Sequence, residues 1–456
     1  MNFSELLNVT SGVVINNMKS DKTFDKISIN SKEVQKNSLF IALKGKNHDS
    51  HDYLEEVIKK RPAFILVEKD ISIKTKIPII KVDSCLDALI KIGSYYRNSF
   101  HGKVICITGS AGKTMTKELI YNILKTKYNV LKSEGNHNNH IGLPLTLNLL
   151  NNRYDVLVLE MGMNHLKEID KLSKMCKPSD AVITNIGTAH IGNLGSKKNI
   201  FKAKMEIING MNNGNLFVDG YDDYLKKIKK INNINIIKVG LDKKLFIKEI
   251  KEDLYRTCFK VTYNDKDYDF TLNIPGAHLI QNCMLAIKVG LSYDISIDEM
   301  VNIINNYKPL NNRLNVYNYG DNILIDDSYN SNFESLSSIL NYLKNQDKNK
   351  ILILGDILEL GKYSKPIHKK IGKIIKKDKF KQILLVGKEM LEVHKINHHS
   401  LYFNSNNELI NHLKQVKIDN SIILVKGSNS MHLAKIVEFL KNKLEEKNNT
   451  FVNCTL

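Results

Sequence analysis

Short, almost continuous apolar runs recur along the chain, and most are followed by a segment with apolar residues at helical spacing. Strands that crossover helices bury on both faces have this pattern. The pattern therefore predicts an α/β protein with parallel sheets. The predicted strands lie in SLFIAL, AFILVE, IPIIKV, VICITG, DVLVLEM, AVITNIG, NLFVDG, ILIDDS, ILILGD, ILLVG and IILVKGS.

These runs divide the chain into three predicted domains. A small mixed α/β domain, over residues 1–84, contains three short strands and the helical stretch DYLEEVIKK. Residues 85–309 are predicted to form a parallel-sheet domain, with one hairpin that turns at Asn264–Asp265. A second α/β domain of Rossmann-like type is predicted over residues 310–456.

Polar residues follow several predicted strands at the point where each strand ends. ICITG runs into SAGKT, VLVLE ends in Glu160, ITNIG leads to His190, and ILIDD ends in Asp327. Ligands of open parallel sheets bind at the carboxyl ends of the strands. Core packing does not require these side chains, so we predict a binding site at these ends.

The segment ITGSAGKTMTKE (107–118) is similar to a phosphate-binding loop, although it is two residues shorter than the usual G-x-x-x-x-G-K-[ST]. A strand, a turn of small residues and a helix that starts at the lysine suffice to bind a phosphate. The string alone could be an ordinary turn, but the strand before it and the helix after it favour a nucleotide site. The predicted nucleotide-binding loop consists of Gly109, Ser110, Ala111, Gly112, Lys113 and Thr114.

The formal net charge of +19 does not by itself indicate a nucleic-acid partner. The chain uses lysine almost everywhere and has five arginines. Stretches such as KKIKK (226–230) and KKIGKIIKKDKFK (369–381) are typical of solvated helix faces. The charge instead suits small polyanions such as nucleotides.

Two further patterns bear on where the protein works. The six cysteines are scattered without zinc-like spacing, which suits reduced thiols in a cytoplasm. The chain has no apolar run of about 18 residues, so we expect no membrane insertion. Its first residues, MNFSELLNVTSG, lack the order of a signal peptide.

Several motifs together resemble the Mur ligase family, the ATP-dependent amide-forming enzymes of peptidoglycan precursor synthesis. The short loop T-G-x-x-G-K-T is one of them, and the others follow in the family's order along nearly the whole chain. They are EGNHNNHIGLPLTL (134–147), EMGMNHLKEI (160–169), TNIGTAHIGNLGS with FKAKMEI (184–207), NIPGAHLIQNCMLAI (273–287), NNRLNV (311–316), IDDSYNSN (325–332), LGDILELG (354–361) and LVKGSNS (424–430).

Within the family, IDDSYNSN, LGDILELG and residues 30–53 are similar to the branch that adds D-alanyl-D-alanine to UDP-N-acetylmuramoyl-tripeptide. The resemblance implies a monomeric cytoplasmic enzyme that takes ATP and these two small molecules. Two alternatives remain. One is another amide ligase of this type, such as the enzyme that adds the third residue (although the chain lacks its D-N-P-R string) or a folylpolyglutamate synthase. The other is a basic P-loop ATPase acting on nucleic acid, against which the missing paired acidic Walker B strand argues.

Transfer of a γ-phosphoryl group to a carboxylate gathers negative charge, so the site must supply Mg²⁺ and cationic donors. Thr114 and Glu160 suit one Mg²⁺, which prefers oxygen ligands, and Lys113 is predicted to reach the β/γ phosphates. By resemblance, His190 is a ligand of a second metal ion and Lys204 is carbamylated by CO₂ to become an oxygen ligand. A lone histidine is more often a satisfied polar residue, and Lys204 could be a helix-surface lysine.

The resemblance also assigns nucleotide and substrate contacts. Asn282 is placed to read adenine with His278 nearby, and Asp327 to hold the ribose hydroxyls. Arg313 is predicted to reach the γ-phosphate when the C-terminal domain closes, and its guanidinium fork suits that role in a lysine-rich chain. The substrate-binding candidates are Ser31, Lys44, Asn138, Asn139, Asn164, His165 and Asn330.

The chain departs from the family's usual residues at a few positions, which puts individual contacts to uridine and the dipeptide in doubt. Arginine is usual at two of them and glycine or glutamate at two others. These departures are Ala277, Asn429, Asn312 and Gly192, and Asn30 and Lys32 replace the usual Asp and Arg of D-S-R.

Overall fold

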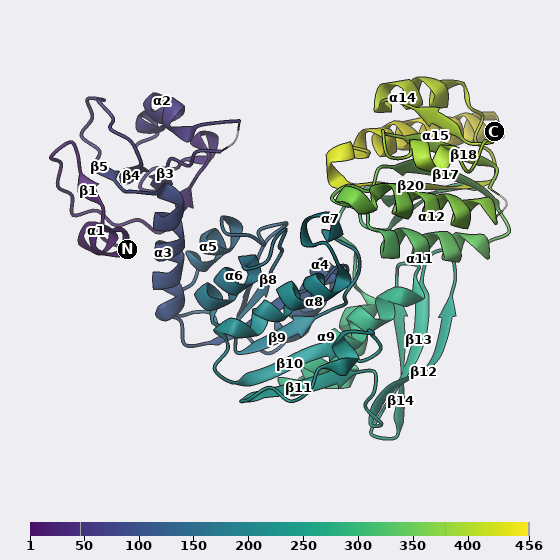
Figure 1. The fold of residues 1–456 in the computed structure, drawn as a ribbon, viewed down its shortest axis with the longest axis horizontal. Coiled ribbons are helices and arrows are strands. Elements are labelled where there is room, and N and C mark those ends of the chain that lie inside the picture. Colours follow the sequence, from purple (N-terminus) through teal and green to yellow (C-terminus); the bar gives the residue numbers. More distant parts are fainter. Residues whose placement is uncertain (46, 379, 455–456) are drawn as a thin grey trace.

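The computed structural model describes residues 1–45, 47–378 and 380–454, and the side chains of this range up to residue 447. The chain forms three α/β domains that follow one another in sequence, each with its own sheet (Figure 1). The first lies at one end of the molecule and the third at the other, with the second between them (Figure 1). The predicted α/β fold class is confirmed.

The first domain contains a five-stranded sheet of order β1-β5-β4-β3-β2. All its pairs are parallel except β1 with β5. The predicted strands in SLFIAL, AFILVE and IPIIKV and the predicted helix in DYLEEVIKK are confirmed. The elements are α1 (Phe3–Thr10), β1 (Val13–Val14), β2 (Ile27–Ser28), β3 (Leu39–Ile41), α2 (Leu54–Lys59), β4 (Phe64–Val67) and β5 (Ile79–Lys81).

Helix α3 (Cys85–Asn98) connects the first domain to the second (Figure 1). Its residues Cys85 and Leu89 are buried in the core of the first domain. At Gly93 it approaches the second domain so closely that an added Cβ would lie 2.9 Å from Pro144 Cα. The helix that begins at the predicted domain boundary therefore packs against both neighbours.

The second domain contains a fully parallel six-stranded sheet of order β11-β10-β9-β6-β8-β7. Its central strands are buried along their length, as their continuous apolar runs predict. The strands are β6 (Lys103–Thr108), β7 (Val130–Lys132), β8 (Val156–Glu160), β9 (Asp180–Ile183), β10 (Gly214–Asp219) and β11 (Ile234–Val239). The helices are α4 (Lys113–Leu124), α5 (Gly142–Leu147), α6 (Glu168–Cys176), α7 (Ile191–Leu194), α8 (Lys197–Met205), α9 (Ile280–Ser292) and α10 (Ile297–Asn305).

A small antiparallel sheet extends from the second domain beneath the third (Figure 1). Strands β13 (Thr257–Tyr263) and β14 (Lys266–Leu272) form the predicted hairpin. Its turn residues Asn264 and Asp265 have φ angles of 47° and 64°, which these residue types tolerate. Strand β12 (Leu245–Glu252), which the pattern did not predict, adds a third strand to the hairpin.

The third domain contains a six-stranded sheet of order β15-β16-β20-β17-β18-β19, parallel except at β15. The predicted strands in ILIDDS, ILILGD, ILLVG and IILVKGS are confirmed. The strands are β15 (Asn315–Tyr319), β16 (Asn322–Asp327), β17 (Asn349–Gly355), β18 (Gln382–Val386), β19 (Leu401–Phe403) and β20 (Ser421–Lys426). The helices are α11 (Phe333–Lys344), α12 (Ser364–Lys376), α13 (Leu391–His394), α14 (Asn406–Gln415) and α15 (Ala434–Cys454).

The two lysine-rich stretches differ in structure. Much of residues 369–381 lies in α12, which buries Ile371 and Ile375 against the core and turns most of its lysines outward. In contrast, residues 226–230 contain a single 3₁₀ turn, Leu225–Lys227, so the prediction of a helix face is wrong there. Their lysines are nevertheless exposed. In the described part of the chain, no helix combines the length and the apolar character needed to cross a membrane.

Candidate active site

The phosphate loop lies between β6 and α4, as predicted. Gly112 is the N-cap of α4 and has a φ of 79°, a conformation that glycine adopts without strain. An added Cβ there would lie 2.4 Å from Asn282 Oδ1, so glycine also makes room for this asparagine. The loop and the first turn of α4 therefore present backbone N–H groups at a helix N-terminus, where anions bind.

A second segment, which follows β9, holds the phosphate loop from the side. The Ala111 N–H donates to Asn185 Oδ1 at 2.9 Å, and the Asn185 amide donates to the Ala111 carbonyl at 3.1 Å. The Thr184 hydroxyl donates to the same carbonyl at 2.5 Å, and the Gly187 N–H donates to Ser110 Oγ at 2.8 Å. Asn185 was not predicted as a site residue, although its place after the strand end in AVITN is a signal that could have identified it.

Thr114 and Glu160 form a buried pair of oxygen ligands. Each is 3% exposed, and the Thr114 hydroxyl donates to Glu160 Oε2 at 2.8 Å. The Asn138 amide donates to the other oxygen, Oε1, at 3.0 Å. Two adjacent oxygen atoms beside the phosphate loop fit Mg²⁺, which keeps several waters and needs few protein ligands. Among the described residues, no three His, Cys, Asp or Glu side chains gather as a metal site.

Two lysines, Lys113 of the loop and Lys204, lie close enough for their charges to interact. Lys113 Nζ donates to the Gly109 carbonyl at 2.9 Å, and burial together with the charge of Arg313 lowers the Lys113 pKa. Lys204, on α8, is 2% exposed, and burial followed by the charge of Lys113 holds its pKa well below the usual value. No hydrogen bond or ion pair to a described residue satisfies its amine. The surface-lysine alternative for Lys204 is therefore wrong.

His190 lies in the segment that follows β9, at the N-cap of α7. Its φ is 61°, which is uncommon for a residue with a side chain and concentrates at functional sites. Its Nδ1 lies 2.7 Å from Glu359 Oε2 of the third domain, and this contact lowers the Glu359 pKa. Glu359 was not predicted as a site residue, because the contact joins segments far apart in sequence.

A cavity of 630 Å³ lies between the second and third domains. The phosphate loop, Glu160 and His190 line it from the second domain, and Arg313 and Asp327 line it from the start of the third. The carboxyl ends of both parallel sheets therefore meet at one site, as the sequence predicts.

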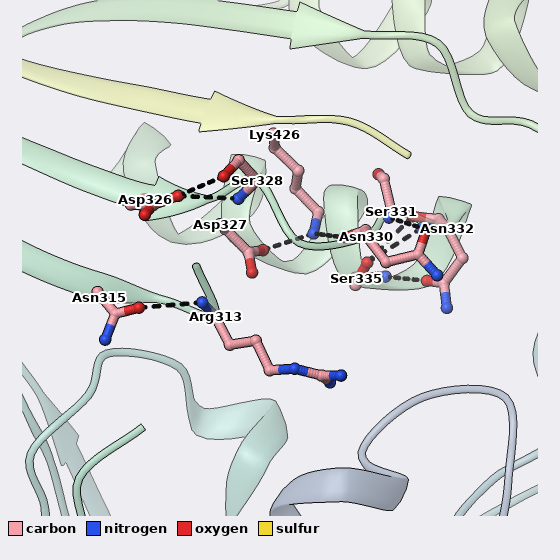
Figure 2. Close-up of polar contacts among 10 residues, drawn as sticks. All are labelled: Arg313, Asn315, Asp326, Asp327, Ser328, Asn330, Ser331, Asn332, Ser335 and Lys426. Atoms are coloured by element: carbon pink, nitrogen blue, oxygen red, sulfur yellow. Dashed lines mark hydrogen bonds and ion pairs between the residues drawn. The ribbon is translucent and has the colours of Figure 1, made fainter. Parts of the chain in front are cut away.

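The nucleotide candidates lie on opposite walls of this cavity. Asn282 is on α9 beside Gly112, and burial followed by the charge of Lys426 lowers the pKa of nearby His278 to about 4. Asp327 pairs directly with Lys426 across strands β16 and β20, and the Lys426 ammonium donates to the Asp327 carboxylate (Figure 2). Lys426 also donates to the Asn330 carbonyl at 3.1 Å. Sequence reasoning missed Lys426, although it ends a predicted strand.

Arg313 extends from the third domain into the cavity, with its guanidinium free of carboxylate partners in Figure 2. Its Cζ lies 3.8 Å from the centroid of the Tyr329 ring, a cation–π contact. Its neighbours Asn312 and Leu314 have φ angles of 63° and 53°. Asparagine tolerates this conformation better than most residues, which explains why it can replace the family's glycine at 312.

Two other departures have a structural reason. An added Cβ on Gly192 would lie 2.5 Å from the Gly361 nitrogen and 2.7 Å from the Glu359 carbonyl oxygen, so no side chain fits there. The Gly192 N–H donates to that carbonyl at 3.0 Å. The Asn429 amide donates to the Tyr329 carbonyl at 3.0 Å and so supports the loop under Arg313. Nothing in the structure explains Ala277.

The substrate-binding candidates divide into two groups. Asn138, Asn139, Asn164 and Asn330 line the cavity. Ser31, Lys44 and His165 are not among its lining residues, and the structure brings none of the three into this site. Ser31 begins a 3₁₀ turn and Lys44 pairs with Asp49, both in the first domain. These assignments remain predictions.

A phosphate loop, a buried Thr–Glu pair and an arginine from a following α/β domain define a P-loop nucleotide-dependent enzyme. Two family models match the chain: the Mur ligase middle domain over residues 107–290, and the Mur ligase, glutamate ligase domain over residues 312–429. The chain belongs to the Mur ligase family.

Relatives match along almost the whole chain. A UDP-N-acetylmuramoyl-tripeptide--D-alanyl-D-alanine ligase of Buchnera aphidicola subsp. Baizongia pistaciae is 33% identical over 96% of this chain and 98% of its own length. The crystal structure of MurF from Acinetobacter baumannii has a TM-score of 0.88 at 28% identity, covering 97% of this chain and 98% of that one. The MurF ligase of Thermotoga maritima, solved in complex with ADP, has a TM-score of 0.82 at 26% identity, covering 92% and 98%.

Replacing Lys113 by alanine tests the phosphate loop. The change removes the amine that is predicted to reach the β/γ phosphates, so we expect ATP-dependent turnover to fall about 10²- to 10³-fold, by analogy with the loss of one oxyanion donor. The fold should persist, because the amine bonds to the Gly109 carbonyl of the loop rather than to the core. Steady-state turnover, measured beside circular dichroism, checks both points. Near-normal turnover of a folded variant would contradict the assignment.

Proposed function

We propose that this protein is the ATP-dependent ligase that joins D-alanyl-D-alanine to UDP-N-acetylmuramoyl-tripeptide, giving the pentapeptide, ADP and phosphate. The observation that carries the proposal is the single cavity in which the phosphate loop faces Arg313 and the strand ends of the third domain. Full-length relatives with this activity in their names support the choice of substrates.

The reaction has two steps in this proposal. A carboxylate oxygen of the tripeptide attacks the γ-phosphorus of ATP, the bond to the bridging oxygen breaks, and ADP leaves. The amine of D-alanyl-D-alanine then attacks the acyl carbon, phosphate leaves, and the amine loses a proton. Lys113 and Arg313 stabilise the negative charge that gathers in the first step. Because the cavity lies between two domains, closure excludes water that would hydrolyse the acyl phosphate.

Bound Mg²⁺ supplies positive charge to the transferring phosphoryl group, and Thr114 and Glu160 would hold one ion. We assign a second ion to His190 and a carbamylated Lys204. The support for the carbamate is chemical: CO₂ reacts with the neutral form of an amine, and burial favours that form of Lys204 by holding its pKa well below the usual value. The product is a carboxylate-like group in place of an amine that has no partner among the described residues.

We place the reaction in the cytoplasm, where reducing conditions suit the buried free thiols Cys85, Cys106, Cys176 and Cys283. We also expect a monomer, as the family resemblance implies.

Phosphate release with purified substrates tests the function. UDP-N-acetylmuramoyl-tripeptides with lysine or diaminopimelate at the third position are supplied with ATP, with and without D-alanyl-D-alanine. We expect phosphate release that depends on both the UDP-N-acetylmuramoyl-tripeptide and D-alanyl-D-alanine. ATP hydrolysis stimulated by polynucleotides and steeply weakened by salt would instead favour a nucleic-acid ATPase. Release with other amino acids but not the dipeptide would indicate a different amide ligase.

Arg313→Lys tests closure of the third domain. The variant keeps a positive charge but loses the two-pronged guanidinium, so we expect a strong loss of turnover and a much smaller loss of ATP binding to the open enzyme. Stopped-flow nucleotide binding beside steady-state ligation separates the two effects. Equal losses in both measurements would show that Arg313 already contacts ATP before closure.

Lys204→Ala tests the carbamate. We expect a nearly inactive enzyme that acetate or another small carboxylate partly rescues, because the carboxylate can occupy the space of the missing group. In the unaltered enzyme, activity should fall when CO₂ is stripped at mildly acidic pH, because acid decomposes carbamates. The mass of the intact protein under CO₂ gives a readout independent of activity. An active Lys204→Ala enzyme, or a bare ammonium beside bound Mg²⁺ in a high-resolution map, would refute the assignment.

A further inference from the structure

The third domain holds the segment of residues 184–196, here called the His190 segment, at several points. Glu334 contacts Thr188, Glu359 contacts His190, and the Tyr363 hydroxyl donates to the Gly195 carbonyl. These contacts join the second domain to the third across the cavity. Of these three contacts, that of Glu334 differs from the others because one carboxylate accepts two hydrogen bonds from the same residue.

Glu334 lies in the first turn of α11, directly after the motif IDDSYNSN. Its Oε2 accepts from the Thr188 N–H at 3.0 Å and from the Thr188 hydroxyl at 2.7 Å. Its Oε1 lies 3.2 Å from Lys197 Nζ. Hydrogen bonds to a charged group are stronger than neutral ones, so this pair is a substantial link between the two domains.

The same end of α11 also contacts the phosphate loop. The Asn332 amide donates to the Ser110 carbonyl at 3.4 Å, while Ser110 Oγ accepts from the Gly187 N–H. An added Cβ on Gly187 would lie 2.9 Å from Glu334 Cδ, so the carboxylate lies directly against the backbone of the His190 segment. The phosphate loop, the His190 segment and α11 therefore form one connected set of contacts.

Two simpler roles do not account for Glu334. It is not needed as the N-cap, because Asn332 caps α11 with a complete capping box. A carboxylate favours a helix N-terminus in general, but that effect does not require two hydrogen bonds from another domain. Glu334 also lines the cavity, where a negative charge repels a triphosphate. Its hydrogen bonds to Thr188 satisfy that charge within the protein.

We propose that Glu334 is a positioning residue for the ligation, which docks the third domain onto Thr188 and thereby fixes the His190 segment and Ser110 for phosphoryl transfer. The proposal rests on the ligase function proposed above. It implies that loss of Glu334 lowers kcat, because the docked arrangement becomes rarer. ATP binding to the second domain changes less, because the phosphate loop retains its bonds to Thr184 and Asn185.

Glu334→Ala is the principal test, and Glu408→Ala is its matched control. Glu408 lies in the first turn of α14, and its carboxylate accepts from the backbone of Asn404 within the third domain. We expect Glu334→Ala to lower kcat about 10- to 150-fold, the equivalent of a charged hydrogen bond, with a much smaller change in the KM for ATP. Glu408→Ala should stay near the unaltered enzyme.

A second set of variants separates docking from a merely structural role. Thr188→Val removes the hydroxyl donor and should lower kcat. Thr188→Ser keeps the donor and should retain most of the kcat of the unaltered enzyme. Adding Thr188→Val to Glu334→Ala should cost little more, because the two residues share one interaction. Small-angle X-ray scattering with ADP should show a larger radius of gyration for Glu334→Ala than for Glu408→Ala.

These readouts can fail independently of the proposed function. Scattering and ADP binding need no ligase substrate, so they report on docking even if the substrates are different. If Glu334→Ala keeps the kcat and the scattering of the unaltered enzyme, the positioning role is refuted. Fully additive losses in the double variant would also refute it. If the unaltered enzyme fails to ligate the dipeptide, the proposed ligase function is refuted, whereas the docking result remains valid.

Discussion

Two parallel sheets from different domains turn their carboxyl ends toward the same cavity, and the chemistry depends on this opposition. Each sheet contributes what its strand ends carry: a phosphate loop and Glu160 from one, Asp327 and Lys426 from the other. Neither set is complete alone, because one carries the predicted phosphate contacts and the other lies beside Arg313 and carries the ribose candidate Asp327. The distance between the two domains therefore affects function as well as packing.

Basic side chains lie close to one another around the cavity, which carboxylates such as Glu160 and Asp327 also line. Lys113 lies near both Lys204 and Arg313, and Lys426 lies near His278. Mutual repulsion and burial lower several pKa values, which is a cost in the free protein. A nucleotide with its phosphates offsets this cost.

Much of the fold follows from local patterns, because the buried strands are continuous apolar runs and their ends are polar. The same logic located the phosphate loop, Glu160 and Asp327. It could not find Glu334 or Glu359, whose importance comes from contacts with Thr188 and His190 in another domain. Nothing in the local sequence around such a carboxylate distinguishes this contact from a solvated helix end. Edge strands such as β12 were not predicted for a related reason, because their alternating charged residues resemble those of a loop.

At Gly192 and Gly361 the second and third domains are in direct contact. Main chain meets main chain there, with an N–H to carbonyl bond of 3.0 Å between Gly192 and Glu359. A contact made by backbone atoms does not depend on side-chain rotamers, and side-chain substitutions elsewhere do not shorten it. In this arrangement the two domains approach each other at this point until their backbones are in van der Waals contact. Residues that line the cavity can vary in size without changing this contact, which leaves the substrate contacts free to diverge.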